Sequence, residues 1–389
     1  MSPSLRQPLL ASRLQGFGTT IFAEMSALAV HTGAINLGQG FPDTDGPPEV
    51  AEAAIAAIRD GRNQYPPGTG IPELRQAIAL HQKRFWGLDV DPDTEVLVTA
   101  GATEAIAAAL LALCETGDEV VAFEPTYDSY HAGVSMAGAS LRVVTLEPPD
   151  YSVDLEALAR AITPRTRLLL VNSPHNPTGK VLTPDELAAI AALCVDHDLI
   201  AVTDEVYEHI VFDGVHRPLA SFPGMASRTL TVSSAGKTFS FTGWKVGWAC
   251  GPAPLVDAVR TAKQFLTYVN GAPFQPAAAL GLGLDDGYFA GLRDGLREQR
   301  DLLCSGLEAA GLTVFRPAGT YFVTTDIRPL GESDGLAFCR SLPARCGVAA
   351  VPNAVFYQDP ARGRHLVRFA FCKRPEVLAE AASRLATLS

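Results

Sequence analysis

The middle of the chain alternates between short runs of β-branched and aliphatic residues and longer segments in which apolar positions recur at helical spacing. The short runs are EVLVT (95–99), EVVAF (119–123), RLLLV (167–171), LIAVT (199–203) and TLTVS (229–233). Segments such as TEAIAAALLALC and TPDELAAIAALCVDH have the pattern of soluble helices. Strand–helix alternation of this kind predicts a mainly parallel sheet covered by helices on both faces.

Two closely packed domains are expected, because 389 residues exceed the usual size of a single core. We expect residues 45–275 to form a large, doubly wound α/β domain. Residues 276–389 begin with a long helical stretch near 276–311 and continue with the strand-like runs TYFVTTD and HLVRFAF, which predicts a smaller α+β domain. Residues 1–44 end in a Gly- and Pro-rich loop and are expected to pack with the small domain.

Polar or Gly-rich clusters follow all five predicted strands. In chain order they are AGATEA, EPTYDSY, NSPHNPTG, DEVYEH and SSAGKTFSFTGWK. Ligands of open α/β sheets bind outside the carboxyl ends of the strands, so these clusters are expected to converge on one crevice.

The first cluster has the features of a phosphate site. AGATEA follows a strand and opens a helix, so its backbone N–H groups and the Thr103 hydroxyl can hold a phosphate at a helix N-terminus. Taken alone, the same residues also fit a simple strand-to-helix turn.

Asp204 ends the apolar strand LIAVT, where an ionised carboxylate needs a cation or strong donor. A protonated pyridine nitrogen is such a partner, and a helix cap or an internal salt bridge is the alternative. Tyr207, three residues further on, and Asn176 in HNPTG can donate to a phenolate oxygen on the same ring. An Asn before Pro is also a common turn residue.

Lys237 lies in SSAGKTFS, where Ala235 and Gly236 allow a planar ligand to approach closely. A lysine at the end of a strand, among donors and cations, can have a lowered pKa and react with an aldehyde to form a Schiff base. Ser234 and Lys245 would add a hydroxyl and a cation to the phosphate site. An ordinary surface lysine is the alternative when the surrounding pattern is ignored.

Composition narrows the class of partner. The net charge of −11 would repel nucleic acid and anionic membranes, so small-molecule substrates are favoured. The seven cysteines are scattered and contain no C-x-x-C pair, which is typical of neither a disulfide framework nor a structural zinc site, and no metal site is predicted. The N-terminus lacks an apolar run of signal-peptide length, and a cytoplasmic location is expected.

The ordered motifs NLGQGFPD, NQYPPGTG, GATEA, EPTYDSY, SPHNPTGK, TDEVYE and SSAGKTFSFTGWKVGW resemble those of class I, fold-type I pyridoxal-phosphate aminotransferases. The resemblance extends from about Phe22 to Arg368. Within the class, the chain is most similar to a branch with three kinds of member: kynurenine aminotransferase (glutamine transaminase K), methionine aminotransferase and the actinobacterial N-succinyldiaminopimelate aminotransferases. This resemblance implies pyridoxal 5′-phosphate as cofactor.

The resemblance also implies roles for single residues around the cofactor ring. Lys237 corresponds to the Schiff-base lysine, which also moves the proton between the substrate and the cofactor. Asp204 corresponds to the partner of the ring nitrogen, and Asn176 and Tyr207 to the partners of the phenolate oxygen. Tyr127 in EPTYDSY matches the residue that stacks on the ring.

Further matches concern the phosphate and the substrate. The residues that bind the cofactor phosphate in this family match Ala102, Thr103, Ser234 and Lys245. Tyr65 is similar to a tyrosine that reaches the phosphate of the other subunit, which implies a homodimer with shared sites. Arg368 matches the arginine that binds the substrate α-carboxylate in a bidentate fork, and Gly40 closes over that carboxylate through its backbone.

Two positions depart from the kynurenine enzymes, which carry an aromatic box around the substrate side chain. Phe22 stands in place of their tryptophan, and Asn270 in place of a phenylalanine from the second subunit. The succinyldiaminopimelate subgroup is instead similar in sequence to the segments FAEMSALA, DGPP, EPTYDSY and GAPFQPA. The expected activity is therefore amino transfer from glutamate in diaminopimelate and lysine biosynthesis.

Other activities remain open at this stage. Broad-specificity transfer from glutamine, methionine or aromatic amino acids uses the same residues, as do β-elimination from cysteine conjugates and an oxidase reaction. A non-catalytic sensor fused to a DNA-binding domain fits less well, because the N-terminal segment is too short for a winged helix and the net charge is negative.

Overall fold

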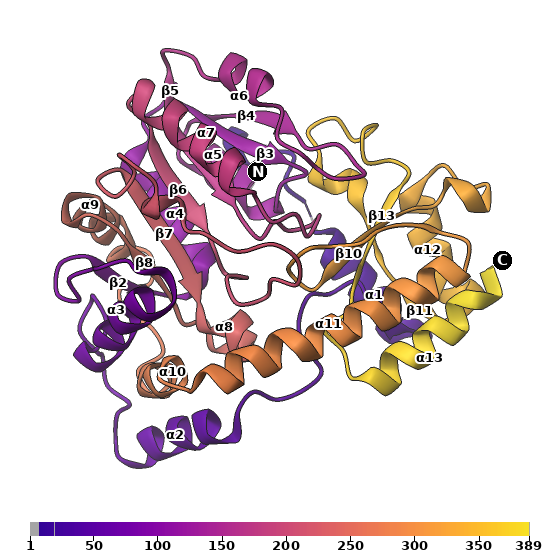
Figure 1. The fold of residues 1–389 in the computed structure, drawn as a ribbon, viewed down its shortest axis with the longest axis horizontal. Helices are drawn as coiled ribbons and strands as arrows, with labels where there is room; N and C mark the ends of the chain where they lie inside the picture. The colour runs from indigo at the N-terminus through magenta and orange to yellow at the C-terminus, as the bar shows by residue number, and fades with distance from the viewer. Residues whose placement is uncertain (1–7, 19, 389) are drawn as a thin grey trace, which may run out of the picture.

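A seven-stranded sheet forms the centre of the larger part of the protein in the computed structural model, which describes residues 8–18 and 20–388 (Figure 1). In spatial order its strands are β2 (Val96–Thr99), β8 (Gly247–Cys250), β7 (Thr229–Ser234), β6 (Ile200–Asp204), β5 (Thr166–Asn172), β3 (Glu119–Glu124) and β4 (Ser140–Thr145). Only β8 runs antiparallel to its neighbours. The predicted mainly parallel sheet is confirmed.

Helices cover both faces of this sheet, because successive residues of each strand point to opposite faces and both faces are largely apolar. Leu97 packs with α4 (Gly101–Leu113), α5 (Asp128–Met136) and α9 (Ala253–Lys263). Its neighbours Val96 and Val98 point to the other face. That face is covered by α3 (Pro72–Trp86), α10 (Phe274–Leu282), α6 (Leu155–Ala161) and α7 (Pro184–Asp196).

The smaller part is a four-stranded antiparallel sheet with helices packed on it. Its strands, in spatial order, are β12 (Val351–Pro352), β13 (Leu366–Ala370), β10 (Phe322–Asp326) and β9 (Thr313–Phe315). The helices are α12 (Gly335–Cys346) and α13 (Pro375–Leu385). The N-terminal segment joins this part through α1 (Ile21–Thr32) and through β1 (Ile35–Asn36), which pairs with β11 (Val348–Ala349).

The helical stretch expected near 276–311 is two helices rather than one. The first is α10, which packs against α3 and α2 (Pro48–Arg59) of the larger part. The second, α11 (Asp286–Ala309), runs from there to α13 at the far side of the molecule (Figure 1). Asp285 caps α11 by accepting a hydrogen bond from the Tyr288 N–H, which explains the break. The boundaries expected at residues 44 and 275 stay a prediction.

The remaining elements are short. They are α8 (Ala235–Thr238) and the 3₁₀ turns η1 (Ser12–Leu14), η2 (Leu219–Ser221), η3 (Thr242–Trp244), η4 (Arg328–Leu330), η5 (Asn353–Phe356) and η6 (Ala386–Leu388). None of the helices in the described part of the chain is long and apolar enough to cross a membrane.

Candidate active site

A cavity of about 330 Å³ lies at the carboxyl ends of the parallel strands. Its walls come from the segments after β2, β3, β5, β6 and β7, and from residues of the N-terminal segment and the small sheet. The cavity brings together the sequence-derived candidates Phe22, Gly40, Ala102, Thr103, Tyr127, Asn176, Asp204, Tyr207, Ser234, Lys237, Lys245 and Arg368. Segments that are far apart in the sequence therefore build one site.

One end of the cavity has the geometry of an anion site. Helix α4 begins at Gly101, whose φ of +75° is accessible to glycine at little cost. A Cβ atom there would lie 3.1 Å from the Lys245 ammonium nitrogen, so the cation sits beside the first turn of the helix. The unpaired N–H groups of that turn and the ammonium both favour negative charge. Thr103 and Ser234 line the same wall.

Asp204 is buried at the end of β6, and burial raises the pKa of its carboxyl group. The Tyr130 hydroxyl donates a hydrogen bond to its Oδ2 atom at 2.7 Å, and the Val206 N–H donates to Oδ1 at 3.4 Å. Within the described residues Asp204 takes part in no ion pair. A buried carboxylate without a cation is costly, so this residue fits a ligand that carries a positive charge.

Lys237 lies at the end of β7, in the short helix α8, and its side chain faces the cavity. Burial lowers the pKa of the Lys237 amine to about 8, so a useful fraction is uncharged near neutral pH. The amine nitrogen lies 5.9 Å from the Tyr207 ring centroid and 5.6 Å from that of Tyr321. The neighbouring Gly236 is tightly packed, because a Cβ atom there would lie 3.1 Å from the Thr242 Cα.

Arg368 projects from β13 into the opposite wall and is buried. Its two terminal nitrogens donate to Asn176 Oδ1 and to the Gly38 carbonyl, each at 3.0 Å, while its Nε has no partner. Burial lowers the pKa of Arg368 to about 10, which leaves the guanidinium charged at neutral pH. The Phe322 ring lies 3.9 Å from the guanidinium carbon. The cation is therefore fixed in position without a carboxylate partner.

Gly40 is placed where only a glycine fits. A Cβ atom there would lie 2.3 Å from the Phe322 Cζ, and the Tyr321 hydroxyl donates to the Gly40 carbonyl at 2.6 Å. The backbone at this position is thus held close to the aromatic ring that covers Arg368.

Tyr130 and Phe322 are among the cavity residues that the sequence argument missed. Tyr130, the second tyrosine of EPTYDSY, lies one helical turn after Tyr127 and is the side chain that donates to Asp204. Spacing along α5 could have suggested it. Phe322 belongs to the predicted strand TYFVTTD, but its approach to Arg368 depends on the pairing of β10 with β13. No local signal gives that register.

Tyr65 and Asn270 lie apart from the other candidates. Tyr65 does not line the cavity; it is 81% exposed and its ring packs edge-on against Tyr268. The side-chain amide of Asn270 donates to the carbonyls of Thr99 and Lys245 at 3.0 and 3.1 Å. Both of its N–H groups are therefore used inside the fold, which leaves neither of them free to donate to a substrate.

Comparisons with known proteins agree with this geometry. The family model for aminotransferase class I and II matches residues 32–385. A probable N-succinyldiaminopimelate aminotransferase of Mycobacterium tuberculosis is 56% identical, over 98% of this chain and 99% of its own length. Methionine aminotransferase of Escherichia coli K12 is 41% identical, over 97% of this chain and 98% of its own length.

A solved structure gives the same result for the fold. N-succinyldiaminopimelate aminotransferase from Mycobacterium tuberculosis superimposes with a TM-score of 0.96 at 57% identity, covering 98% of this chain and 100% of that chain. The chain belongs to the class I and II aminotransferases and is a transferase enzyme. The resemblance stated from the motifs and the fold-type I architecture are both confirmed.

Proposed function

We propose that this aminotransferase uses pyridoxal 5′-phosphate to move an amino group from glutamate to N-succinyl-2-amino-6-oxopimelate. One observation carries the cofactor part of the proposal. The cavity holds a lysine of lowered pKa, a buried carboxylate with no ion-pair partner and a helix N-terminus beside an ammonium group. These are the groups that an aldehyde, a protonated ring nitrogen and a phosphate require.

The residues present fit that cofactor. Lys245, Thr103, Ser234 and the first turn of α4 would hold the phosphate, and Asp204 would pair with the ring nitrogen. Tyr127 would stack on the ring, while Asn176 and Tyr207 would face its phenolate oxygen. When bound, the cofactor supplies an aldehyde and an electron-accepting ring.

The chain itself binds, orients and moves protons. Arg368 would hold the substrate α-carboxylate, with Gly40 and Phe322 closing over it and excluding water. The uncharged Lys237 amine would take the proton from the substrate α-carbon and return it at the cofactor side. Asp204, held by Tyr130, would pair with the protonated ring nitrogen and so stabilise the negative charge that develops at the substrate α-carbon.

The substrate part of the proposal rests on the relatives and on the departures at Phe22 and Asn270. A succinylated substrate carries a remote carboxylate. Burying this group without a partner would cost roughly 3–5 kcal/mol of binding free energy, by analogy with broken buried ion pairs. Among the described lining residues the cations are Lys237, Lys245 and Arg368, and all three have other roles in the proposal. A cationic partner for the remote carboxylate would therefore have to come from outside this lining.

A homodimer would supply that outside surface and is part of the proposal. Tyr65, Phe265 and Tyr268 are 81%, 83% and 56% exposed, and Leu266 between them is 46% exposed. An apolar patch of this kind is typical of a protein–protein interface. A second copy packed on it would bring Tyr65 toward the other phosphate site. The cytoplasmic location is also proposed, supported by seven cysteines that form no disulfide.

The test is a comparison of kcat/KM for succinyldiaminopimelate, methionine, glutamine, phenylalanine and kynurenine as amino donors, because that ratio reports differential transition-state binding. Succinyldiaminopimelate should give the highest value. If another donor exceeds it by tenfold, about 1.4 kcal/mol, the broad-specificity reaction replaces it. Pyruvate release from a cysteine conjugate, without amino transfer, would instead indicate a β-lyase.

A further inference from the structure

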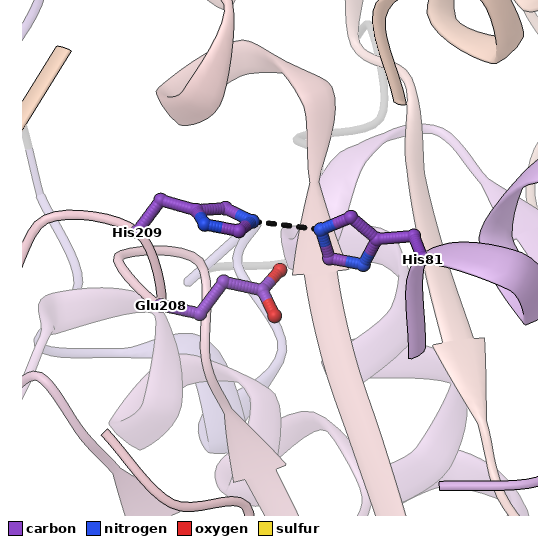
Figure 2. A group of neighbouring side chains, drawn as sticks. All are labelled: His81, Glu208 and His209. Carbon is purple, nitrogen blue, oxygen red and sulfur yellow. Dashed lines mark hydrogen bonds between the residues drawn. The ribbon is translucent and has the colours of Figure 1, made fainter. Parts of the chain in front are cut away.

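A second group of reactive side chains lies behind the turn that carries Asp204 and Tyr207. His81 from α3 meets Glu208 and His209, which directly follow Tyr207 in the chain (Figure 2). The two Nε2 atoms are 2.7 Å apart, and the carboxylate of Glu208 lies beside this contact (Figure 2). One ligand atom from each residue falls within 4.8 Å of the others. None of the three lines the active-site cavity.

The carboxylate of Glu208 is already held in one orientation. Ser233 Oγ donates to its Oε1 at 2.6 Å, and the Trp86 indole N–H donates to Oε2 at 2.5 Å. A carboxylate that accepts one hydrogen bond on each oxygen keeps a further lone pair on each. Outer hydrogen bonds of this kind commonly orient the ligands of metal ions.

The two histidines are poorly satisfied without a ligand. Their Nε2 atoms face each other and share one proton, and this is the position that an ion bound to both rings would take; the Nδ1 atom of His81, which is buried without a partner among the described residues, is not a ligand in this arrangement. Aromatic rings close the site on several sides, with Phe85 4.9 Å from His81 and Phe289 4.4 Å from His209, centroid to centroid. His209 is only partly buried, which leaves a way in from the surface.

A neighbouring cluster of possible metal ligands already has a hydrogen bond between two of its members. Glu205, Glu208 and His216 are also near one another, but the Nε2 atom of His216 lies 2.9 Å from the Glu205 carboxylate. That ring nitrogen therefore already has a carboxylate partner, whereas among the described residues the Nε2 atoms of His81 and His209 are hydrogen-bonded only to each other.

We propose that His81, Glu208 and His209 bind a divalent first-row transition-metal ion, with Zn²⁺ the best match. Two imidazoles and a carboxylate are a common donor set for Zn²⁺. Nitrogen ligands at about 2.0–2.1 Å from a tetrahedral ion lie about 3.3 Å apart, so the histidines need to separate by roughly 0.6 Å from their present hydrogen-bond distance. The ion takes the place of the shared proton.

The site joins two parts of the chain that are 128 residues apart. The ion ties α3 to the turn after β6, and the same turn presents Asp204 and Tyr207 to the cavity on its other side. Its role is structural: it stabilises the turn from behind without touching the substrate. The cysteine pattern, which argued against a zinc site, gives no information on ligands that meet only in the folded chain.

The experiment uses holoenzyme freed of metal with a chelator and titrated with Co²⁺, whose visible bands report a tetrahedral N/O site at wavelengths beyond the absorption of the cofactor. One equivalent should bind and be displaced by Zn²⁺, and Zn²⁺ should raise the thermal midpoint. His81→Gln and His209→Gln should each weaken binding by about 100-fold or more, since even the loss of an outer contact costs 10–100-fold.

His197→Gln is the matched control, because His197 is an exposed histidine at the end of α7. It should keep the Co²⁺ bands and the Zn²⁺ shift. Absence of the bands in the wild-type protein overturns the proposal without reference to any variant. Bands that survive either His81→Gln or His209→Gln also overturn it, since they place the ion elsewhere. Amino transfer by the wild-type enzyme is measured separately, so failure here leaves the proposed reaction standing.

Discussion

Gly40→Ala should weaken the handling of the substrate carboxylate while leaving cofactor binding intact. The added methyl carbon would lie 2.3 Å from Phe322 Cζ and 3.0 Å from Tyr321 Cε2. Carbon atoms pack best at about 3.5–4.0 Å, so the Phe322 ring has to shift by about 1 Å or more. Backbone movement offers little relief, because the Tyr321 hydroxyl holds the Gly40 carbonyl at 2.6 Å.

The displaced ring lies directly on Arg368, the residue proposed to bind the substrate α-carboxylate. Phe322 is 3.9 Å from the guanidinium carbon of Arg368, so its shift moves or uncovers the cation. A displacement of about 1 Å at a substrate-positioning group can cost up to about 100-fold in rate. We expect kcat/KM for glutamate to fall by about 10- to 100-fold, which is ~1.4–2.8 kcal/mol.

Steady-state assays with glutamate, together with the cofactor content from absorbance, test this expectation. Gly291→Ala is the control, because a Cβ atom at this helical position meets nothing within 4 Å, and it should keep wild-type kinetics. A Gly40→Ala enzyme with kcat/KM within twofold of the wild type would refute the role given to this glycine. A loss of bound cofactor in the same variant would contradict the expectation that the change affects only the handling of the substrate carboxylate.

Three further changes test the cofactor residues. Lys237→Ala should leave a folded protein that binds the cofactor without a covalent link. Borohydride reduction should then attach no cofactor to the protein. Attachment of the cofactor to another lysine would contradict the assignment. Asp204→Ala should keep covalent cofactor binding but lose most of the single-turnover rate with glutamate, and an unchanged rate would remove its role. Covalent capture of the cofactor by the apoenzyme needs the uncharged Lys237 amine. The rate of capture should therefore rise with pH with a midpoint near 8, the lowered pKa of Lys237. A midpoint near the ordinary lysine pKa of 10.5 would contradict the effect of burial.

The strands of the large sheet were predictable where they are long and apolar. All five predicted runs are strands, because they are almost fully buried and rich in β-branched and aliphatic residues. Two strands were missed. β4 is a half-exposed edge strand that carries Arg142, and β8 is a four-residue run, GWAC, beginning with glycine. β8 is too short, and β4 too interrupted by polar residues, to give a clear strand signal.

Much of the candidate site was predictable because many of its residues follow the strand ends, which the topology brings together, while Phe22, Gly40 and Arg368 were indicated by the family resemblance. Contacts that depend on side-chain packing were not. Tyr130 reaches Asp204 across 74 positions in sequence, and Arg368 reaches the Gly38 carbonyl across 330. The two amide hydrogens of Asn270 are used by backbone carbonyls, which no local pattern indicates.

The turn after β6 shows why a site of this kind depends on residues that never meet the substrate. Asp204 and Tyr207 face the cavity, while Glu205 and Glu208 point to the other side and are buried there. Burial of two carboxylates is tolerated because each has strong donors: His216 for Glu205, and Ser233 and Trp86 for Glu208. These contacts fix the backbone between the four residues. We therefore expect any loosening behind the turn to move Asp204 relative to Lys237, and the proposed chemistry requires these two groups to stay in fixed positions.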